Sequence, residues 1–504
     1  MASSESTQER TILGHPSGLF VLFFAELWER FCYYGMRALL VFHLLGQFQK
    51  TPGDAAVIYG AYTALVYALG IFGGYVADRV LGYSRSIILG GVIMAIGCFT
   101  LLSKDETWFR VGLATIIVGN GLFKPNISTM VGRLYPQGDP RRDSGFTIFY
   151  MGINLGAFLA PIFCARISRW MSDIVDPVTN ATVPDYRYGF MLAGIGMVLG
   201  IIVFGAGTKS LQGKGVPPPE RRGPMPLVAV TLGCIATIPL MYLLLLRKEE
   251  VGIALGLLGA GMVVYLLAFA LKNERVVRDR IFALLILLAC NVMFWASFEQ
   301  AGNSLNIFAA NHIHHLRLDM FDWTMLAEDF QSVNAIGIVM LGPVFAAMWV
   351  KLAKADANPS IPAKFGLGLI QVGLGFGLLM LGMQSADEAG MIPWYWLAGL
   401  YLIHTSGELC VSPVGLSMVT KLAPERMVGM VMGSWFVSIA CANYAAGLFS
   451  KIAGEVEIAA DATGPAALNG YTTAFTPILY LAVGLGIALL LASRLVNKLM
   501  HGVK

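Results

Sequence analysis

Long apolar stretches, separated by short polar segments, recur along the chain from residue 18 almost to its end. A helix that crosses a bilayer needs about 20 predominantly apolar residues, and it satisfies its backbone hydrogen bonds internally. Fourteen stretches meet this criterion. They cover residues 18–47, 54–79, 85–103, 108–132, 144–170, 188–207, 225–246, 250–271, 280–310, 328–352, 362–384, 392–421, 428–450 and 471–499. The pattern predicts an all-α polytopic membrane protein with fourteen transmembrane helices.

Two polar segments divide these stretches into groups. The proline-rich basic segment "GKGVPPPERRGP" follows the sixth stretch, and the charged "KNERVVRDR" follows the eighth. The two stretches between them carry no intramembrane charge, so we expect a structural role for them. The expected segments are a tail at 1–17, a six-helix bundle at 18–207, a linker at 208–224, an inserted hairpin at 225–271 and a second six-helix bundle at 272–504.

The two six-helix groups share a local pattern. Residues 124–136 ("KPNISTMVGRLYP") and 412–424 ("SPVGLSMVTKLAP") align at the pairs Pro125/Pro413, Met130/Met418, Val131/Val419, Leu134/Leu422 and Pro136/Pro424. Chance similarity between two apolar helices is the alternative. A parallel repeat of two six-helix halves is typical of the major facilitator fold, which places its substrate site between the halves. The segment "GGYVADRVLGYSR" (73–85) also resembles a loop of that superfamily, G-x-x-x-D-R-x-x-G.

Composition narrows the class of protein. The chain is 56% hydrophobic and 13% charged, which exceeds the apolar content that a soluble protein of this length can bury. The net charge of +4 is modest, and Lys and Arg concentrate in alternate loops, so we expect a cell-membrane protein with both termini cytoplasmic and no nucleic-acid partner. No nucleophile–base pair, metal spacing or nucleotide loop is present in the sequence. Neither an enzyme nor a bound cofactor is expected.

The first apolar stretch carries charge in a regular pattern. Its polar positions recur at helical spacing and fall on one face: Glu26, Glu29, Arg30, Tyr33, Tyr34 and Arg37. A charge at the bilayer centre costs at least about 2.5–3.5 kcal/mol, so these side chains should face a watery cavity and one another. A structural salt-bridge ladder is the alternative. We favour a polar translocation pathway.

Three further charged residues lie in apolar surroundings: Lys124, Glu299 and Glu408. Arg37 and Glu299 lie at similar depth in their helices, one in each half, and we hypothesise that they pair and close the outer mouth. Lys124 lies at the depth of the first-helix carboxylates. A protonatable carboxylate beside Arg and Lys is a switchable ion pair, because protonation releases its partner.

The segment "ELWERFCYYG" (26–35) resembles the first-helix motif E-x-x-E-R-F-x-Y-Y-G of the proton-dependent oligopeptide transporter family. Further similar elements are "GLFKPNIS" (121–128), "FYMGINLGAFLAP" (149–161), "FWASFEQAGNSLN" and "GELCVSPVGLSMV". The resemblance runs over nearly the whole chain. The first-helix motif is the most specific of these elements, because it places several charges within lipid.

The resemblance implies a symporter that imports di- and tripeptides by alternating access, with the proton as coupling ion. It implies proton-coupling roles for Glu26, Glu29, Arg30, Lys124 and Glu299, and a gate made of Arg37 and Glu299. The implied peptide contacts are Arg30, Tyr33, Tyr34, Arg37, Tyr67, Lys124, Asn154, Trp295, Glu299, Asn334, Glu408 and Trp435. Cations of the first half would hold the peptide carboxylate, and Glu408 would hold the ammonium group.

Several alternatives stay open for individual residues. Tyr67, Trp295 and Trp435 could line side-chain pockets or serve in ordinary helix packing. Asn154 and Asn334 could instead make interhelical hydrogen bonds. The second stretch has no histidine, unlike that of animal family members, so the carboxylates must carry the proton.

Other substrates and other classes of membrane protein also stay open. A carrier for nitrate or another small charged solute is the alternative substrate class, but Glu408 favours a substrate that bears an ammonium group. Flux without proton coupling would indicate a channel, and binding without flux would indicate a receptor.

Overall fold

The computed structural model describes residues 11–136, 139, 141–171, 173–175, 182–217, 219–424, 427–459 and 464–503. Residues 1–10 of the expected tail therefore lie outside the described part. Residues 11–16 of that tail form a short antiparallel pair, β1 (Thr11–Ile12) with β2 (His15–Pro16).

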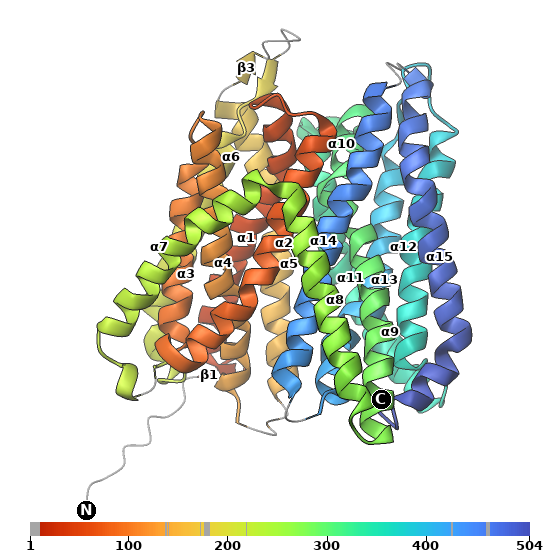
Figure 1. The fold of residues 1–504 in the computed structure, drawn as a ribbon. Coiled ribbons are helices and arrows are strands. Elements are labelled where there is room, and N and C mark those ends of the chain that lie inside the picture. The colour runs from red at the N-terminus through yellow and green to blue at the C-terminus, as the bar shows by residue number, and fades with distance from the viewer. Residues whose placement is uncertain are drawn as a thin grey trace, which may run out of the picture. The chain divides into compact units, whose positions relative to one another are not determined.

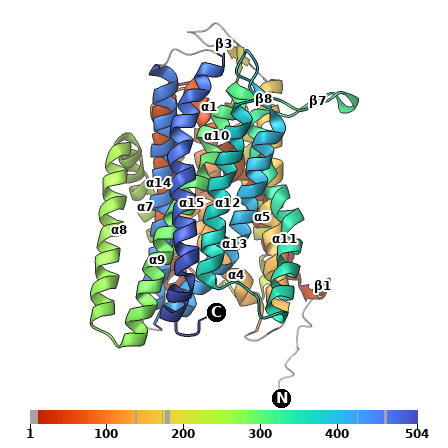
Figure 2. The ribbon, with the colours of Figure 1, turned by 90° about the vertical axis from the view of Figure 1, so that its right-hand side faces the viewer.

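Helices dominate the described residues (Figures 1 and 2). The helices of the first half are α1 (Ser17–Gly46), α2 (Pro52–Val76), α3 (Tyr83–Thr100), α4 (Glu106–Leu134), α5 (Arg141–Met171) and α6 (Arg187–Gly207). Two helices follow the linker, α7 (Met225–Leu246) and α8 (Lys248–Leu271). The remaining helices are α9 (Arg275–Phe298), α10 (Ser304–His312), α11 (Phe330–Lys354), α12 (Ile361–Met383), α13 (Trp394–Leu422), α14 (Val428–Ala459) and α15 (Leu468–Leu499).

Short elements connect these helices. A π-helical segment (Ala77–Leu81) follows α2, and 3-10 turns lie at Thr208–Leu211, Pro219–Arg221, Glu299–Gly302, Asp319–Phe321, Ala327–Asp329 and Gly464–Ala467. Three further strand pairs are β3 (Asp173–Val175) with β4 (Thr182–Pro184), β5 (Ile313–His314) with β8 (Ile392–Pro393), and β6 (Arg317–Leu318) with β7 (Trp323–Thr324). Of the four described strand pairs, β5–β8 is parallel and the other three are antiparallel.

Thirteen of the fourteen expected spans correspond to one long helix each, and the expected all-α membrane class is confirmed. The expected span 280–310 is instead divided, because α9 ends at Phe298 and α10 begins at Ser304. Among the described residues, eleven helical segments are long and apolar enough to cross a membrane. The helices outside that set include α1, α4 and α13, which carry Glu26, Lys124 and Glu408.

The chain forms two compact units. The first comprises residues 1–36, 69–167 and 187–242, and the second comprises 37–68, 168–186 and 243–504. Helices α1, α2, α5 and α7 thus contribute to both units. The segment boundaries expected from the sequence stay a prediction.

Glycine allows close helix packing in the first unit. A methyl group added at Gly90 of α3 would lie 2.6 Å from the carbonyl oxygen of Gly119 in α4. A methyl group at Gly73 of α2 would overlap the carbonyl oxygen of Gly121. Because a Cβ cannot approach a backbone oxygen so closely, these contacts require glycine. They bring α2 and α3 against the part of α4 that precedes Lys124.

The apolar core of the second unit is built from α8, α9, α12, α13, α14 and α15. Its fully buried members include Phe294, Phe365 and Val411. Proline lies inside α13 at Pro413, as it does inside α4 at Pro125. Both positions belong to the repeat expected from the sequence, and each removes one backbone hydrogen bond from its helix.

Candidate functional site

The charged face of α1 is buried in the first unit. Glu26, Glu29 and Arg30 are at most 3% exposed. The Arg30 guanidinium pairs with both carboxylates, at 3.1 Å from Glu26 Oε1 and 2.5 Å from Glu29 Oε2. Asn120 of α4 donates from Nδ2 to the other Glu29 oxygen at 3.0 Å. Glu26 Oε2 has no hydrogen-bond partner among the described residues, so this buried carboxylate has an oxygen that can accept a proton or a donor group.

Two cations approach the ring of Tyr33. Arg30 Cζ lies 5.3 Å from the ring centroid, and Lys124 Nζ of α4 lies 5.9 Å from it. Cations within about 6 Å of an aromatic face are attracted by the ring quadrupole. Tyr34 packs edge-on against Tyr33, with centroids 5.3 Å apart. The structure therefore brings together two cations and two tyrosines that the resemblance names as peptide contacts.

Local backbone chemistry of α4 positions Lys124. Pro125 has no N–H to donate to the carbonyl of Gly121, and that carbonyl lies against Gly73. Asn126 donates to the carbonyl of Leu122 at 2.7 Å and to that of Gly73 at 3.2 Å. These contacts fix the segment on either side of Lys124 against α2.

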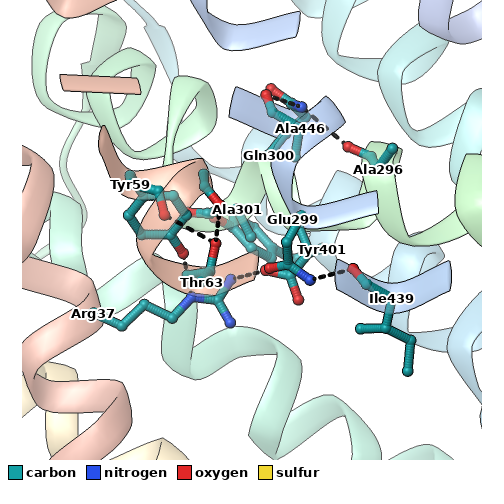
Figure 3. Close-up of polar contacts among 12 residues, drawn as sticks. Arg37, Tyr59, Thr63, Ala296, Glu299, Gln300, Ala301, Tyr401, Ile439 and Ala446 are labelled. Atoms are coloured by element: carbon teal, nitrogen blue, oxygen red, sulfur yellow. Dashed lines mark hydrogen bonds and ion pairs between the residues drawn. The ribbon is translucent and has the colours of Figure 1, made fainter. Parts of the chain in front are cut away.

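Arg37 and Glu299 form an ion pair within the second unit (Figure 3). Arg37 NH2 lies 2.5 Å from Glu299 Oε2, and the two residues are 6% and 4% exposed. Arg37 Nε also donates to the hydroxyl of Tyr59 on α2. The predicted pairing is thus present, while its role as a gate stays a prediction.

The break between α9 and α10 positions Glu299. The chain forms a 3-10 turn at Glu299–Gly302, where a methyl group on Gly302 would overlap the Tyr59 hydroxyl. Asn303 donates to the carbonyl of Ala56 at 3.2 Å, and Asn306 donates to the carbonyl of Ala38 at 2.9 Å. These side-chain hydrogen bonds hold the turn and α10 against the C-terminal part of α1 and the N-terminal part of α2. Both parts belong to the second unit.

Glu408 on α13 is the second buried carboxylate of this unit, at 8% exposure. Asn334 of α11 donates from Nδ2 to Glu408 Oε2 at 2.9 Å and to Thr405 Oγ1 at 3.0 Å. Among the described residues no cation forms an ion pair with Glu408. The group therefore has capacity to bind an ammonium ion, and Asn334 makes the interhelical hydrogen bond that was one of its two expected roles.

The three aromatic candidates all belong to the second unit. Trp435 is 4% exposed and is part of the apolar core, and Tyr67 and Trp295 pack against that core. The Nε1 donor of Trp295 is buried without a partner among the described residues. Trp295 thus has a buried N–H donor that no described group accepts from. The expected roles of Tyr67, Trp295 and Trp435 as peptide contacts stay predictions.

Asn154 on α5 belongs to the first unit and is 4% exposed. Its Nδ2 donates to the carbonyl of Tyr150 at 2.9 Å, one turn earlier in the same helix. This contact is neither the interhelical bond nor a link to the charged face of α1. Its peptide-contact role stays a prediction.

Sequence reasoning missed several residues of these clusters. Asn120 lies one turn before Lys124, and Tyr59 is one of several tyrosines of the second stretch, so only their three-dimensional neighbours distinguish them.

A third buried cluster was missed entirely: Arg169 NH2 lies 3.1 Å from Glu328 Oε1, to which the Tyr186 hydroxyl also donates at 3.1 Å. Glu328 lies at the edge of an apolar stretch, where a carboxylate gives no signal of burial.

Within the described ranges, no three His, Cys, Asp or Glu side chains group as a metal site. The buried charge is instead divided between carboxylates and guanidinium or ammonium groups. Such an arrangement can bind zwitterions and exchange protons.

Known proteins are similar to this chain in sequence and in fold. The family model described as "POT family" matches residues 84–465. The chain is 31% identical to dipeptide and tripeptide permease B of Aliivibrio fischeri, over 97% of this chain and 96% of the relative, and 35% identical to peptide transporter YePEPT of Yersinia enterocolitica, over 88% and 89%. A crystal structure of a peptide transporter POT in complex with sulfate has a TM-score of 0.81, at 36% identity and 98% coverage of both chains. The chain thus belongs to the POT family and is a membrane-embedded peptide transporter of the major facilitator type.

Proposed function

We propose that the protein is a proton-coupled symporter that imports di- and tripeptides by alternating access. The observation that carries this proposal is the buried group of two carboxylates and two cations on α1 and α4. Two relatives that carry peptide-transport names support the substrate class. No cofactor is proposed, and the proton is the coupling ion.

The peptide carboxylate is proposed to bind Arg30 and Lys124. Both cations lie about the ring of Tyr33, and a guanidinium binds a carboxylate through two parallel hydrogen bonds. The guanidinium of Arg30 pairs with the carboxylates of Glu26 and Glu29. A peptide carboxylate therefore competes with these side chains for the same guanidinium.

The peptide ammonium group is proposed to bind Glu408. Its carboxylate is held by Asn334 through a neutral donor, so its charge is not already balanced by that contact. The indole N–H of Trp295 provides a further donor to the peptide backbone. Because the two ends of the peptide supply most of the orientation, many side chains can be accommodated.

Proton coupling follows from competition at Arg30. Protonation of Glu26 or Glu29 weakens the ion pair between that carboxylate and the Arg30 guanidinium. The guanidinium can then bind the peptide carboxylate. Glu299 is proposed to act in the same way on Arg37, so that its protonation opens the gate.

The decisive experiment is uptake of radiolabelled dialanine into liposomes that contain the purified protein. We expect accumulation only with an inward proton gradient, and competition by unlabelled di- and tripeptides but not by free alanine. Uptake of nitrate without uptake of peptide would instead support the small-anion carrier. In that carrier Glu408 would repel the substrate, which is why we favour the peptide.

The concentration of Lys and Arg in alternate loops supports a cell-membrane orientation with both termini cytoplasmic. Labelling of a single cysteine introduced near Lys498 tests it. An impermeant thiol reagent should reach this position only after the cells are opened.

A further inference from the structure

An apolar groove lies in the first unit, between α7 and the packed pair α2 and α4. Its volume is about 340 Å³, and its lining includes Phe72 and Val76 of α2, Leu122 of α4, and Val230, Gly233 and Thr237 of α7. Phe72 of α2 is 66% exposed, and apolar side chains of α7 such as Leu232 are similarly exposed. In a membrane-embedded chain such a groove opens toward the lipid, because exposed apolar side chains face acyl chains there. Figure 1 shows α7 beside these helices.

Cations gather where both walls of the groove end. Val76 lines the groove, and Arg79 follows it in the π-helical segment. The linker that enters α7 carries Arg221 and Arg222 directly before that helix. Arg85 of α3 donates to the carbonyls of Arg222 and Gly223 at 2.6 and 3.1 Å, so the linker is fastened beside the end of α2.

These cations have no acidic partner in the described part of the chain. No ion pair is found for Arg79, Arg221, Arg222, Lys209 or Lys214 there, and the described linker residues contain one carboxylate, Glu220. Asp78 is engaged by Tyr83 and lies 3.8 Å from Arg133. A second cavity, of about 540 Å³, is lined by Arg85, Arg222 and backbone of the linker. The parts of α2 and α7 that line the groove are thus each flanked in the chain by cations that have no acidic partner among the described residues.

We propose that this region binds one anionic phospholipid. The phosphate contacts Arg79, Arg221 and Arg222, and one acyl chain lies in the groove between α7 and α2. A soluble anion has no acyl chain to place in the groove. The amine of a zwitterionic lipid would be repelled by the cations. Basic pockets between transmembrane helices bind anionic headgroups for the same reason. The site goes beyond peptide transport and assigns a role to the first helix of the inserted hairpin.

Native mass spectrometry of the full chain with defined lipids tests the proposal. Phosphatidylglycerol should remain bound at energies that strip phosphatidylcholine. The Arg221→Gln/Arg222→Gln variant should weaken phosphatidylglycerol binding by about fivefold for each cation removed. Gly233→Leu should block the acyl chain, since nothing lies within 4 Å of a Cβ added there.

Gly256→Leu on α8 is the matched control for the groove, because that position is equally open and lies outside the lining. It should bind phosphatidylglycerol as the wild type does, and unchanged thermal melting of each variant shows that it is folded. Equal retention of both lipids, or unchanged phosphatidylglycerol binding in the arginine and Gly233 variants, would overturn the proposal. Displacement of the lipid by glycerol phosphate with no effect of Gly233→Leu would also overturn it, since the site would then bind a phosphate alone.

Discussion

The guanidinium of Arg37 and the carboxylate of Glu299 form a buried ion pair 2.5 Å long between α1 and the turn that follows α9. Each group is buried together with its partner, so loss of either one leaves an uncompensated charge. The pair was expected from the depth of the two residues in their helices. The hydrogen bond from Arg37 to Tyr59 and the break between α9 and α10 were not expected.

Reversal of one charge in this pair should abolish its closing function. Arg37→Glu or Glu299→Arg should each lower dialanine uptake by at least about tenfold, because like charges then face each other in a buried site. The double variant Arg37→Glu/Glu299→Arg should recover part of the uptake. Recovery should be partial since the hydrogen bond from Arg37 to Tyr59 is lost. A double variant as inactive as the single ones would contradict the gate.

Glu408→Gln should weaken the binding of peptides that have a free amino end. The glutamine oxygen can still accept from Asn334, so only the charge is removed. Affinity for dialanine should fall by about tenfold or more, since a charge-assisted hydrogen bond contributes about 1.5–3 kcal/mol. Affinity for N-acetyl-dialanine should change little. Competition assays with both peptides measure this, and equal losses would rule out the ammonium role.

Lys124→Ala should change the coupling to protons. Removal of this cation leaves Glu26, Glu29 and Arg30 with net negative charge, so the pH at which proton-driven uptake is half-maximal should shift. Lys124→Arg keeps the charge and is the control. Uptake measured across a pH series tests both variants, and an unaltered profile in Lys124→Ala would remove Lys124 from the coupling group.

Gly73→Ala should destabilise the first unit, because the added methyl group overlaps the Gly121 carbonyl. Overpacking of this kind costs about 1–3 kcal/mol. Gly70→Ala on the same helix is the control, since nothing lies within 4 Å of its Cβ. Thermal melting in detergent should show a lower midpoint for Gly73→Ala alone. Identical midpoints would mean that α2 and α4 can separate at this contact without cost.

Glu328→Ala should destabilise the second unit by about 2–4 kcal/mol, because Arg169 and Tyr186 lose a fully buried carboxylate. The exposed pair Arg317–Asp319 offers a control, and Asp319→Ala should change stability by less than about 1 kcal/mol. Chemical denaturation measures both variants. Equal effects would show that burial of Glu328 is not what stabilises the cluster.

The same cluster predicts a pH dependence. Burial, and then the neighbouring Glu328, raise the pKa of the Tyr186 phenol well above its ordinary range. A folded-state pKa above the unfolded value of about 10 gives a stability contribution that is complete below pH 10. It is lost as the pH rises through the folded value. Tyr186→Phe should reduce the loss of stability above pH 10, and an identical alkaline melting profile in wild type and variant would contradict this.

The sequence predicts the helices well because the same physical constraint, burial in lipid, acts along the whole chain. Long apolar runs in a membrane form helices, so thirteen expected spans match single helices. The break after Phe298 was not predicted, since Glu299–Gly302 interrupts an apolar run by only a few residues. Its cause is tertiary: side chains of Asn303 and Asn306 bond to backbone of α2 and α1.

Charge was also the most informative signal for the site. A buried charge needs a partner, and this argument pairs Arg37 with Glu299 from the sequence alone. Neutral residues carry no such constraint. The sequence therefore does not single out Asn120, Tyr59 or Thr405.

Proton movement driven by peptide tests the central proposal most directly. Liposomes that contain the protein and a pH-sensitive dye in the lumen receive dialanine outside, with no imposed pH gradient and the membrane potential clamped. Proton-coupled symport predicts that the lumen acidifies as the peptide enters, and that Glu26→Gln or Glu29→Gln reduces this acidification. Peptide entry at constant lumenal pH would contradict proton coupling.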